Sequence, residues 1–203
     1  SLSKINRNMI VTTPAGVCIN DESIIMNILL ANDASGNITV YIGDKNITQE
    51  CLGQNTEINI TSLLNKGEND VKIIYSGNKK YSNQTKEEKI FVNGLYPNIN
   101  ITMPENLKIG DEINITIHLP QQASGNIIVS VGDKNLTINN VSKEKTIDIA
   151  DLLIAGYNTV SIKYSGDNFW NSQIKKETIY LSKITPIMRI NTTSIVKAGE
   201  DTT

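Results

Sequence analysis

The chain has 203 residues, 39% of them hydrophobic and only 5% aromatic, so its cores are small and consist mainly of Ile, Val and Leu. Its 19 basic and 21 acidic residues give a formal net charge of −2, which excludes the basic surface that nucleic acid or an anionic membrane would need. No apolar run reaches the roughly 20 residues that span a bilayer. We therefore expect no nucleic-acid partner and no membrane insertion within this fragment.

An internal repeat organises the chain. The offset is 89 residues, as between Ala34 and Ala123, and it holds without insertion from about Asn27 to Leu181. The matching segments include 34–38 with 123–127, 43–46 with 132–135, 63–64 with 152–153, and 75–77 with 164–166. Self-similarity at a fixed period is the signature of a repeat architecture, so we interpret the chain as a duplication.

The same offset continues beyond the second copy, since Pro97 matches Pro186 and Gly110 matches Gly199. We therefore expect repeat 1 at 1–95, repeat 2 at 96–184 and the truncated start of a third repeat at 185–203, which implies that the parent protein has at least one more repeat. Each linker is short and ends in proline, which prevents helix continuation and stiffens the connection.

Taken in chain order, the predicted elements are short strands with strong alternation of apolar and polar residues, which is complete in 113–119. In the first copy they cover 24–30, 38–42, 58–60, 71–75 and 90–92, and in the second 113–119, 127–131, 147–149, 160–164 and 179–181. Such alternation buries one face of an antiparallel sheet. Residues 62–67 and 151–156 fit a single helical turn whose two leucines close the bottom of the core. About seven strands in 90 residues predict an all-β protein of two tandem seven-stranded immunoglobulin-like β-sandwiches, plus the first strand of a third repeat.

The segments Ala123–Asn135 and Leu152–Asp167, with their counterparts in the first copy, resemble the Ig-like repeats of prokaryotic surface proteins. The closest resemblance is to the repeats in adhesin-like proteins of methanogenic archaea. That resemblance implies an extracellular, cell-surface location on an archaeal cell, long repeat arrays and a role in cell adhesion. It supplies no catalytic residues and no cofactor. One departure is Asn78, where the second copy has Asp167.

Residue chemistry argues against an enzyme. His118 is the only histidine and falls on an outward strand position, so neither a Ser-His-Asp triad nor a metal site is expected. Cys18 and Cys51 are expected at opposite ends of repeat 1, farther apart than the ~7 Å Cα separation that a disulfide tolerates. We predict that both are free thiols. In the 89-residue register, Asn140 occupies the place of Cys51.

Asn-x-Ser/Thr sequons are frequent and are candidate N-glycosylation sites of a glycoprotein, provided that the protein is secreted and the sites are exposed. They are Asn37, Asn46, Asn59, Asn83, Asn100, Asn114, Asn135, Asn140 and Asn191. An Asn- and Thr-rich β-protein also forms sequons by chance, and this alternative remains open.

Three functions fit these observations. The first is a non-catalytic stalk or spacer that projects a distal binding region and supports attachment, with the other repeats of the same chain as partners. The second is a binding module for a glycan or protein of a host or neighbouring cell, using the aromatic loop with Phe169 and Trp170 and its counterpart Tyr81. The third is an accessory β-domain of a secreted enzyme whose catalytic part lies outside this fragment.

Overall fold

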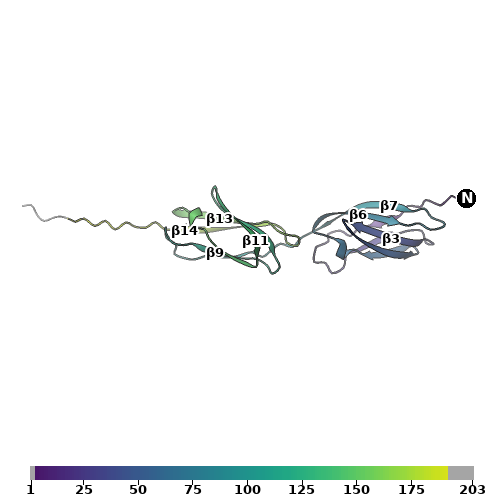
Figure 1. The fold of residues 1–203 in the computed structure, drawn as a ribbon, viewed down its shortest axis with the longest axis horizontal. Helices are drawn as coiled ribbons and strands as arrows, with labels where there is room; N and C mark the ends of the chain where they lie inside the picture. Colours follow the sequence, from purple (N-terminus) through teal and green to yellow (C-terminus); the bar gives the residue numbers. More distant parts are fainter. Residues whose placement is uncertain (1–2, 192–203) are drawn as a thin grey trace, which may run out of the picture.

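The structure is a computed structural model that describes residues 3–191. Two β-sandwiches lie end to end along the long axis of the molecule, joined by a short linker (Figure 1). Each contains seven strands, so the expected pair of tandem seven-stranded sandwiches is confirmed. We call the end of each sandwich that carries its Tyr-Ser-Gly loop the upper end, and the end that carries its short 3₁₀ helix the lower end.

Repeat 1 is formed by a three-stranded and a four-stranded antiparallel sheet, in the orders β1-β2-β5 and β4-β3-β6-β7. Its elements are β1 (Ile10–Thr12), β2 (Ile25–Leu29), β3 (Ser35–Ile42), β4 (Lys45–Leu52), β5 (Asn55–Asn59), η1 (Thr61–Leu63), β6 (Gly67–Tyr75) and β7 (Gln84–Val92).

Repeat 2 has the same topology, with sheets in the orders β12-β9-β8 and β11-β10-β13-β14. Its elements are β8 (Asn100–Thr102), β9 (Asn114–His118), β10 (Ser124–Val131), β11 (Lys134–Ser142), β12 (Glu144–Asp148), η2 (Ala150–Leu152), β13 (Gly156–Tyr164) and β14 (Gln173–Leu181). None of the helices within residues 3–191 is long and apolar enough to cross a bilayer.

The two cores are separate. One cluster of buried side chains runs from Met9 to Val92 and the other from Ile99 to Leu181, inside the predicted boundaries 1–95 and 96–184. Along β6 and β13 every second side chain is buried, because successive side chains of a strand point to opposite faces of the sheet. The alternation in the sequence therefore predicted which residues form the core.

One difference between the repeats is a β-bulge that the constant sequence offset conceals. In repeat 1 Gly36 pairs with Cys51, whereas in repeat 2 Gly125 pairs with Val141 after a register shift. The extra residue is accommodated near Asn140, whose φ of 54° lies in the left-handed region. The buried place of Cys51 is thus taken by Val141, and the expected equivalence with Asn140 is wrong by one residue.

A first strand of a third repeat was predicted within residues 185–203. The structure describes this segment as far as residue 191 and has no strand in residues 183–191. The rest of that prediction, residues 192–203, lies outside the described residues. In repeat 2 the first strand, β8, pairs with β9. The counterpart of Asn114, where β9 begins, is residue 203, which is not among the described residues.

Candidate functional site

At the lower end of each repeat, a buried asparagine organises the turn before the long hairpin. In repeat 1 the side-chain amide of Asn69 donates to the carbonyl oxygens of Asn65 (2.7 Å) and Gly67 (3.0 Å), and its Oδ1 accepts from the Asn65 backbone N–H (2.9 Å). Asn158 makes the same three bonds to Ile154 and Gly156. A buried polar side chain is costly unless its groups are paired, and each asparagine meets this need by bonding the backbone of the turn, which explains why it recurs in both copies.

At the upper end, the Ala-Ser-Gly-Asn and Tyr-Ser-Gly motifs recur because they pack closely on each other. A Cβ atom on Gly125 would lie 2.8 Å from Ser165 Oγ and 2.9 Å from the Gly166 carbonyl oxygen. A Cβ atom on Gly36 would likewise lie 2.7 Å from Ser76 Oγ and 2.7 Å from the Gly77 carbonyl oxygen. The two motifs therefore hold the upper loop, residues 76–82 in repeat 1 and 165–171 in repeat 2, against the first residues of β3 and β10.

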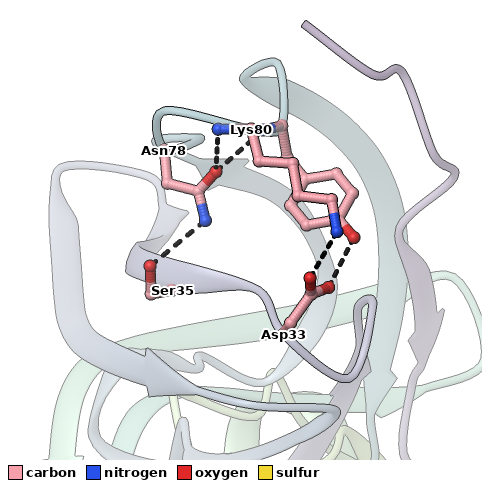
Figure 2. A network of polar contacts seen from close by, with 5 residues as sticks. Asp33, Ser35, Asn78 and Lys80 are labelled. Carbon is pink, nitrogen blue, oxygen red and sulfur yellow. Dashed lines mark hydrogen bonds and ion pairs between the residues drawn. The ribbon is translucent and has the colours of Figure 1, made fainter.

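The upper loop of repeat 1 carries a polar network centred on Asp33 (Figure 2). The Asp33 carboxylate accepts hydrogen bonds from Lys80 Nζ and the Tyr81 hydroxyl, each at 2.5 Å. The bond from Lys80, followed by that from Tyr81, lowers the pKa of Asp33 to about 2. Asn78 completes the network, because its Oδ1 accepts from the backbone N–H groups of Lys80 and Tyr81 while its Nδ2 donates to Ser35 Oγ.

In repeat 2 the carboxylate that organises the upper loop belongs to the loop itself. Asp167 replaces Asn78 and accepts the equivalent backbone bonds from Phe169 (2.8 Å) and Trp170 (2.7 Å). Its second oxygen accepts from the Ser124 backbone N–H and lies 2.9 Å from the Tyr164 hydroxyl. Burial raises the pKa of Asp167, but these donors outweigh that effect and hold the pKa below its usual value. Burial, followed by the nearby Asp167, raises the pKa of Tyr164.

The linker that precedes each repeat adds a short β-bridge to the upper loop. The Leu95 backbone N–H donates to the Phe169 carbonyl oxygen (3.2 Å), and the Asn171 N–H donates to the Leu95 carbonyl oxygen (2.7 Å). Ile5 makes the equivalent pair of bonds with Lys80 and Ser82. Each repeat is therefore tied to the chain that enters it, which limits the swivelling of the linker.

Lys66 connects the two repeats directly. It comes from the lower end of repeat 1, and its Nζ donates to the carbonyl oxygens of Asp167 and Trp170 in the upper loop of repeat 2, at 2.6 Å in the case of Trp170. We call these two oxygens the carbonyl pair. Asn171 Nδ2 adds a bond of 2.7 Å to the Gly94 carbonyl oxygen. We call this assembly of Lys66, the linker and the upper loop of repeat 2 the joint.

The predicted aromatic binding loop therefore lies at the joint. Tyr81 is only 5% exposed and its hydroxyl is bound to Asp33, so its ring face is not available to a ligand. Trp170 is partly buried against the core of repeat 2 and stacks edge-on with Phe169, their ring centroids 5.4 Å apart. Phe169, 38% exposed, is the most accessible of the three predicted binding residues.

The other candidate residues are dispersed. Cys18 is half-buried near the lower end and Cys51 is buried near the upper end of β4, and the structure has both unpaired. His118 lies on the outer face of the three-stranded sheet, with Nδ1 3.3 Å from Glu144 and Nε2 3.2 Å from Thr102. All nine sequon asparagines have exposed side chains, so their glycosylation remains a prediction that sterics permit. In the described part of the chain, no three His, Cys, Asp or Glu residues are grouped to hold a metal ion.

The fold and the joint define a class of protein, that of tandem Ig-like β-sandwich modules linked end to end. Among solved structures, the chain is similar to the fibronectin(III)-like modules of Clostridium thermocellum CbhA, with 12% identity, a TM-score of 0.38, and coverage of 90% of this chain and 100% of that one. It is also similar to a two-domain fibronectin type-III segment of chicken tenascin, with 13% identity, a TM-score of 0.47, and coverage of 86% and 98%.

A third similar structure is the BSP domain of a biofilm associated protein, with 14% identity, a TM-score of 0.28, and coverage of 87% of this chain and 30% of that one. No protein-family model matches the chain, and no curated protein does. At such low identities and scores, the likenesses add nothing to the fold that strand pairing already defines.

Two features of the site could not be predicted from the sequence. The repeat identified Asn69 and Asn158 as matching positions, but only their hydrogen bonds show that they pair the backbone of a turn. Lys66 has no counterpart lysine, since residue 155 is alanine, so comparison of the two copies offered no signal for it.

Proposed function

We propose that this chain is a non-catalytic segment of a cell-surface, adhesin-like protein, in which tandem Ig-like repeats form a stalk that holds a distal binding region away from the cell. Its nearest partners are the other repeats of the same chain. This role requires modules that fold independently and stack in a defined direction. It requires no pocket and no reactive side chain.

The observation that carries the proposal is the joint. Lys66 spans from one sandwich to the carbonyl pair of the next, while Leu95 ties the linker to the same loop. Contacts on both sides of a short linker favour one orientation of the repeats over a freely swivelling pair. An array built in this way gains length with every repeat, as a spacer must.

Small-angle X-ray scattering of the chain in solution tests this function. Strands of nine residues span about 30 Å, so two stacked sandwiches with their loops would measure roughly 80 Å from end to end. We expect a distance distribution with the two maxima of a dumbbell and a long tail. A compact, globular distribution would contradict the stalk.

The alternative is that the repeats themselves bind a glycan or protein through the loop around Phe169 and Trp170. It is favoured by the partial exposure of Phe169 beside Trp170, since paired aromatics suit sugar faces. The use of this loop's carbonyl groups in the joint counts against it. A glycan array that compares the chain with Phe169→Ala separates the two functions, because a spacer would show no Phe169-dependent binding.

A further inference from the structure

At the joint, the side chain of Lys66 occupies the space that any side chain at position 94 would need. A Cβ atom built on Gly94 would lie 2.5 Å from Lys66 Cδ and 2.6 Å from Asn171 Oδ1. Carbon atoms do not approach so closely without displacement. The first joint therefore works with lysine at position 66 and glycine at position 94, and the two positions share one site.

At the lower end of repeat 2, these two positions have exchanged their residue types. Residue 66 directly precedes β6 and residue 155 directly precedes β13, while residues 94 and 183 each follow the last residue of β7 and β14 by two. The pairings of Gly67 with Val92 and of Gly156 with Leu181 place these ends in the same register. Lys66 and Gly94 thus correspond to Ala155 and Lys183.

We propose that the lower end of repeat 2 is an interaction surface for the upper loop of a following repeat of this kind. Lys183 there takes the role of Lys66 and binds the two carbonyl oxygens of that loop that correspond to the carbonyl pair. This inference rests on the proposed stalk function. Ala155 leaves the shared space open, and the side chain of Lys183 enters it from the linker. In both arrangements one ammonium group binds the two equivalent carbonyl oxygens in the upper loop of the repeat that follows.

The occupant is indicated by continuity with the joint already present. In repeat 1 the exposed ring of Phe91 lines a cleft of about 500 Å³ that also includes Asn171 and Ser172 of repeat 2. The counterpart of Phe91 is Tyr180, which is 56% exposed and packs on Tyr157, 79% exposed, at 4.9 Å between ring centroids. Tyr180 therefore lies on the part of repeat 2 that corresponds to the surface facing the neighbouring repeat in the first joint, and Tyr157 packs beside it.

The chain after Lys183 also matches the start of a repeat. Met188 is 83% exposed, whereas its counterpart Ile99 is buried in the core of repeat 2. An apolar side chain in this position acquires a core only when the remaining strands of a third sandwich surround it. The pair Lys183-Ile184 is also present before repeat 1 as Lys4-Ile5, where Ile5 makes the same bridge to the upper loop as Leu95.

The inference can be tested in the chain as it stands, by moving the second arrangement into the first joint. The variants are Lys66→Ala, Gly94→Lys, the double variant Lys66→Ala/Gly94→Lys, and the double variant Lys66→Ala/Gly94→Met, which fills the space without a charge. Residual dipolar couplings report whether the two repeats share one alignment tensor. The methyl spectra of Ile58 and Ile147 report that both repeats remain folded.

We expect a shared tensor for the wild-type chain and for Lys66→Ala/Gly94→Lys, and its loss in both single variants and in Lys66→Ala/Gly94→Met. The proposal is overturned if the lysine double variant orders the repeats no better than Lys66→Ala does, or if the methionine double variant orders them equally well. It is overturned with the stalk itself if the wild-type repeats share no tensor. A glycan-array signal that Tyr157→Ser abolishes would assign the surface to a carbohydrate instead.

Discussion

Lys66 and Trp170 are 104 residues apart in the sequence and belong to different sandwiches, yet the Lys66 ammonium donates to the Trp170 carbonyl oxygen at 2.6 Å. The same ammonium also binds the carbonyl oxygen of Asp167. A charged donor that reaches two backbone acceptors makes stronger hydrogen bonds than a neutral pair. The contact therefore couples two modules whose cores are separate.

Removal of this contact should weaken the coupling of the repeats without unfolding either. We expect Lys66→Ala to lower the stability that repeat 2 gains from the presence of repeat 1 by about 1.5–3 kcal/mol, the range for hydrogen bonds to a charged group. Urea unfolding of the two-repeat chain, followed by tryptophan fluorescence of Trp170, measures it. Lys45→Ala is the matched control, because Lys45 donates to the Ser62 carbonyl oxygen within repeat 1. An equal effect of both variants on repeat 2 would contradict coupling through Lys66.

The close packing at the upper end predicts that Gly125 tolerates no side chain. Gly125→Ala should destabilise repeat 2 by about 1–3 kcal/mol, as overpacking of a tight contact does, because its Cβ would lie within 3 Å of Ser165 and Gly166. Gly132→Ala is the control. A Cβ atom at this position would have no atom within 4 Å, so the left-handed φ of 55° would be the only source of strain. Thermal unfolding compares the two variants, and a larger loss in Gly132→Ala would refute the packing argument.

The buried Asn158 predicts a second stability effect at the lower end. Asn158→Ala would leave the backbone groups of Ile154 and Gly156 without their three bonds, which we expect to cost about 2–3 kcal/mol. Asn135→Ala, an exposed asparagine on β11, should change the stability of repeat 2 by less than about 0.5 kcal/mol. Chemical denaturation gives both values. Equal values would show that the turn does not depend on Asn158.

The lowered pKa of Asp33 predicts that repeat 1 loses stability in acid. The pKa is about 2 in the folded repeat against an ordinary value of 3.8, so the folded state binds the Asp33 proton less tightly than the unfolded chain does. The stabilisation is therefore fully present above about pH 4 and is lost as the pH falls towards 2. Unfolding curves of repeat 1 between pH 2 and 5 measure this. Asp33→Asn should flatten the pH dependence, and an unchanged slope in that variant would assign it to other carboxylates.

The two cysteines should differ in reactivity, because Cys51 is fully buried and Cys18 is partly accessible. We expect a thiol reagent to label Cys18 in the native chain and Cys51 only when repeat 1 opens. Mass spectrometry of peptides from the labelled chain distinguishes them. Failure of both to react after denaturation would indicate a disulfide and contradict the predicted free thiols.

Much of the fold could be predicted because burial in a sheet imposes a period of two on the sequence. Ile113, Ile115 and Ile117 alternate with polar residues and are all buried in the core of repeat 2. Because the chain is duplicated, the pattern of each strand could be compared between two copies. The β-bulge at Asn140 was missed because a shortened turn after β11 restores the same offset, so that the sequence shows no insertion.

The candidate site was less accessible to prediction. Aromatic residues in a loop suggested a binding surface at Phe169 and Trp170, but only the path of the linker shows that this loop is the contact point between repeats. Tyr81 and Trp170 look equivalent in sequence, whereas Asp33 and Lys80 have no equivalents in repeat 2 and give Tyr81 a bonded, buried setting.

The sequence by itself determined the all-β class, the repeat length and the inward-facing residues, since each follows from local alternation and from identity between the two copies. Only the tertiary structure decided what the lower-end lysine does. A hydrogen bond from Lys66 to a loop 104 residues away depends on the relative placement of two sandwiches, and no local pattern encodes that placement. The exchange of Lys66 and Gly94 for Ala155 and Lys183 was visible in the sequence, but it acquired meaning only when the structure showed that the first two residues share one space.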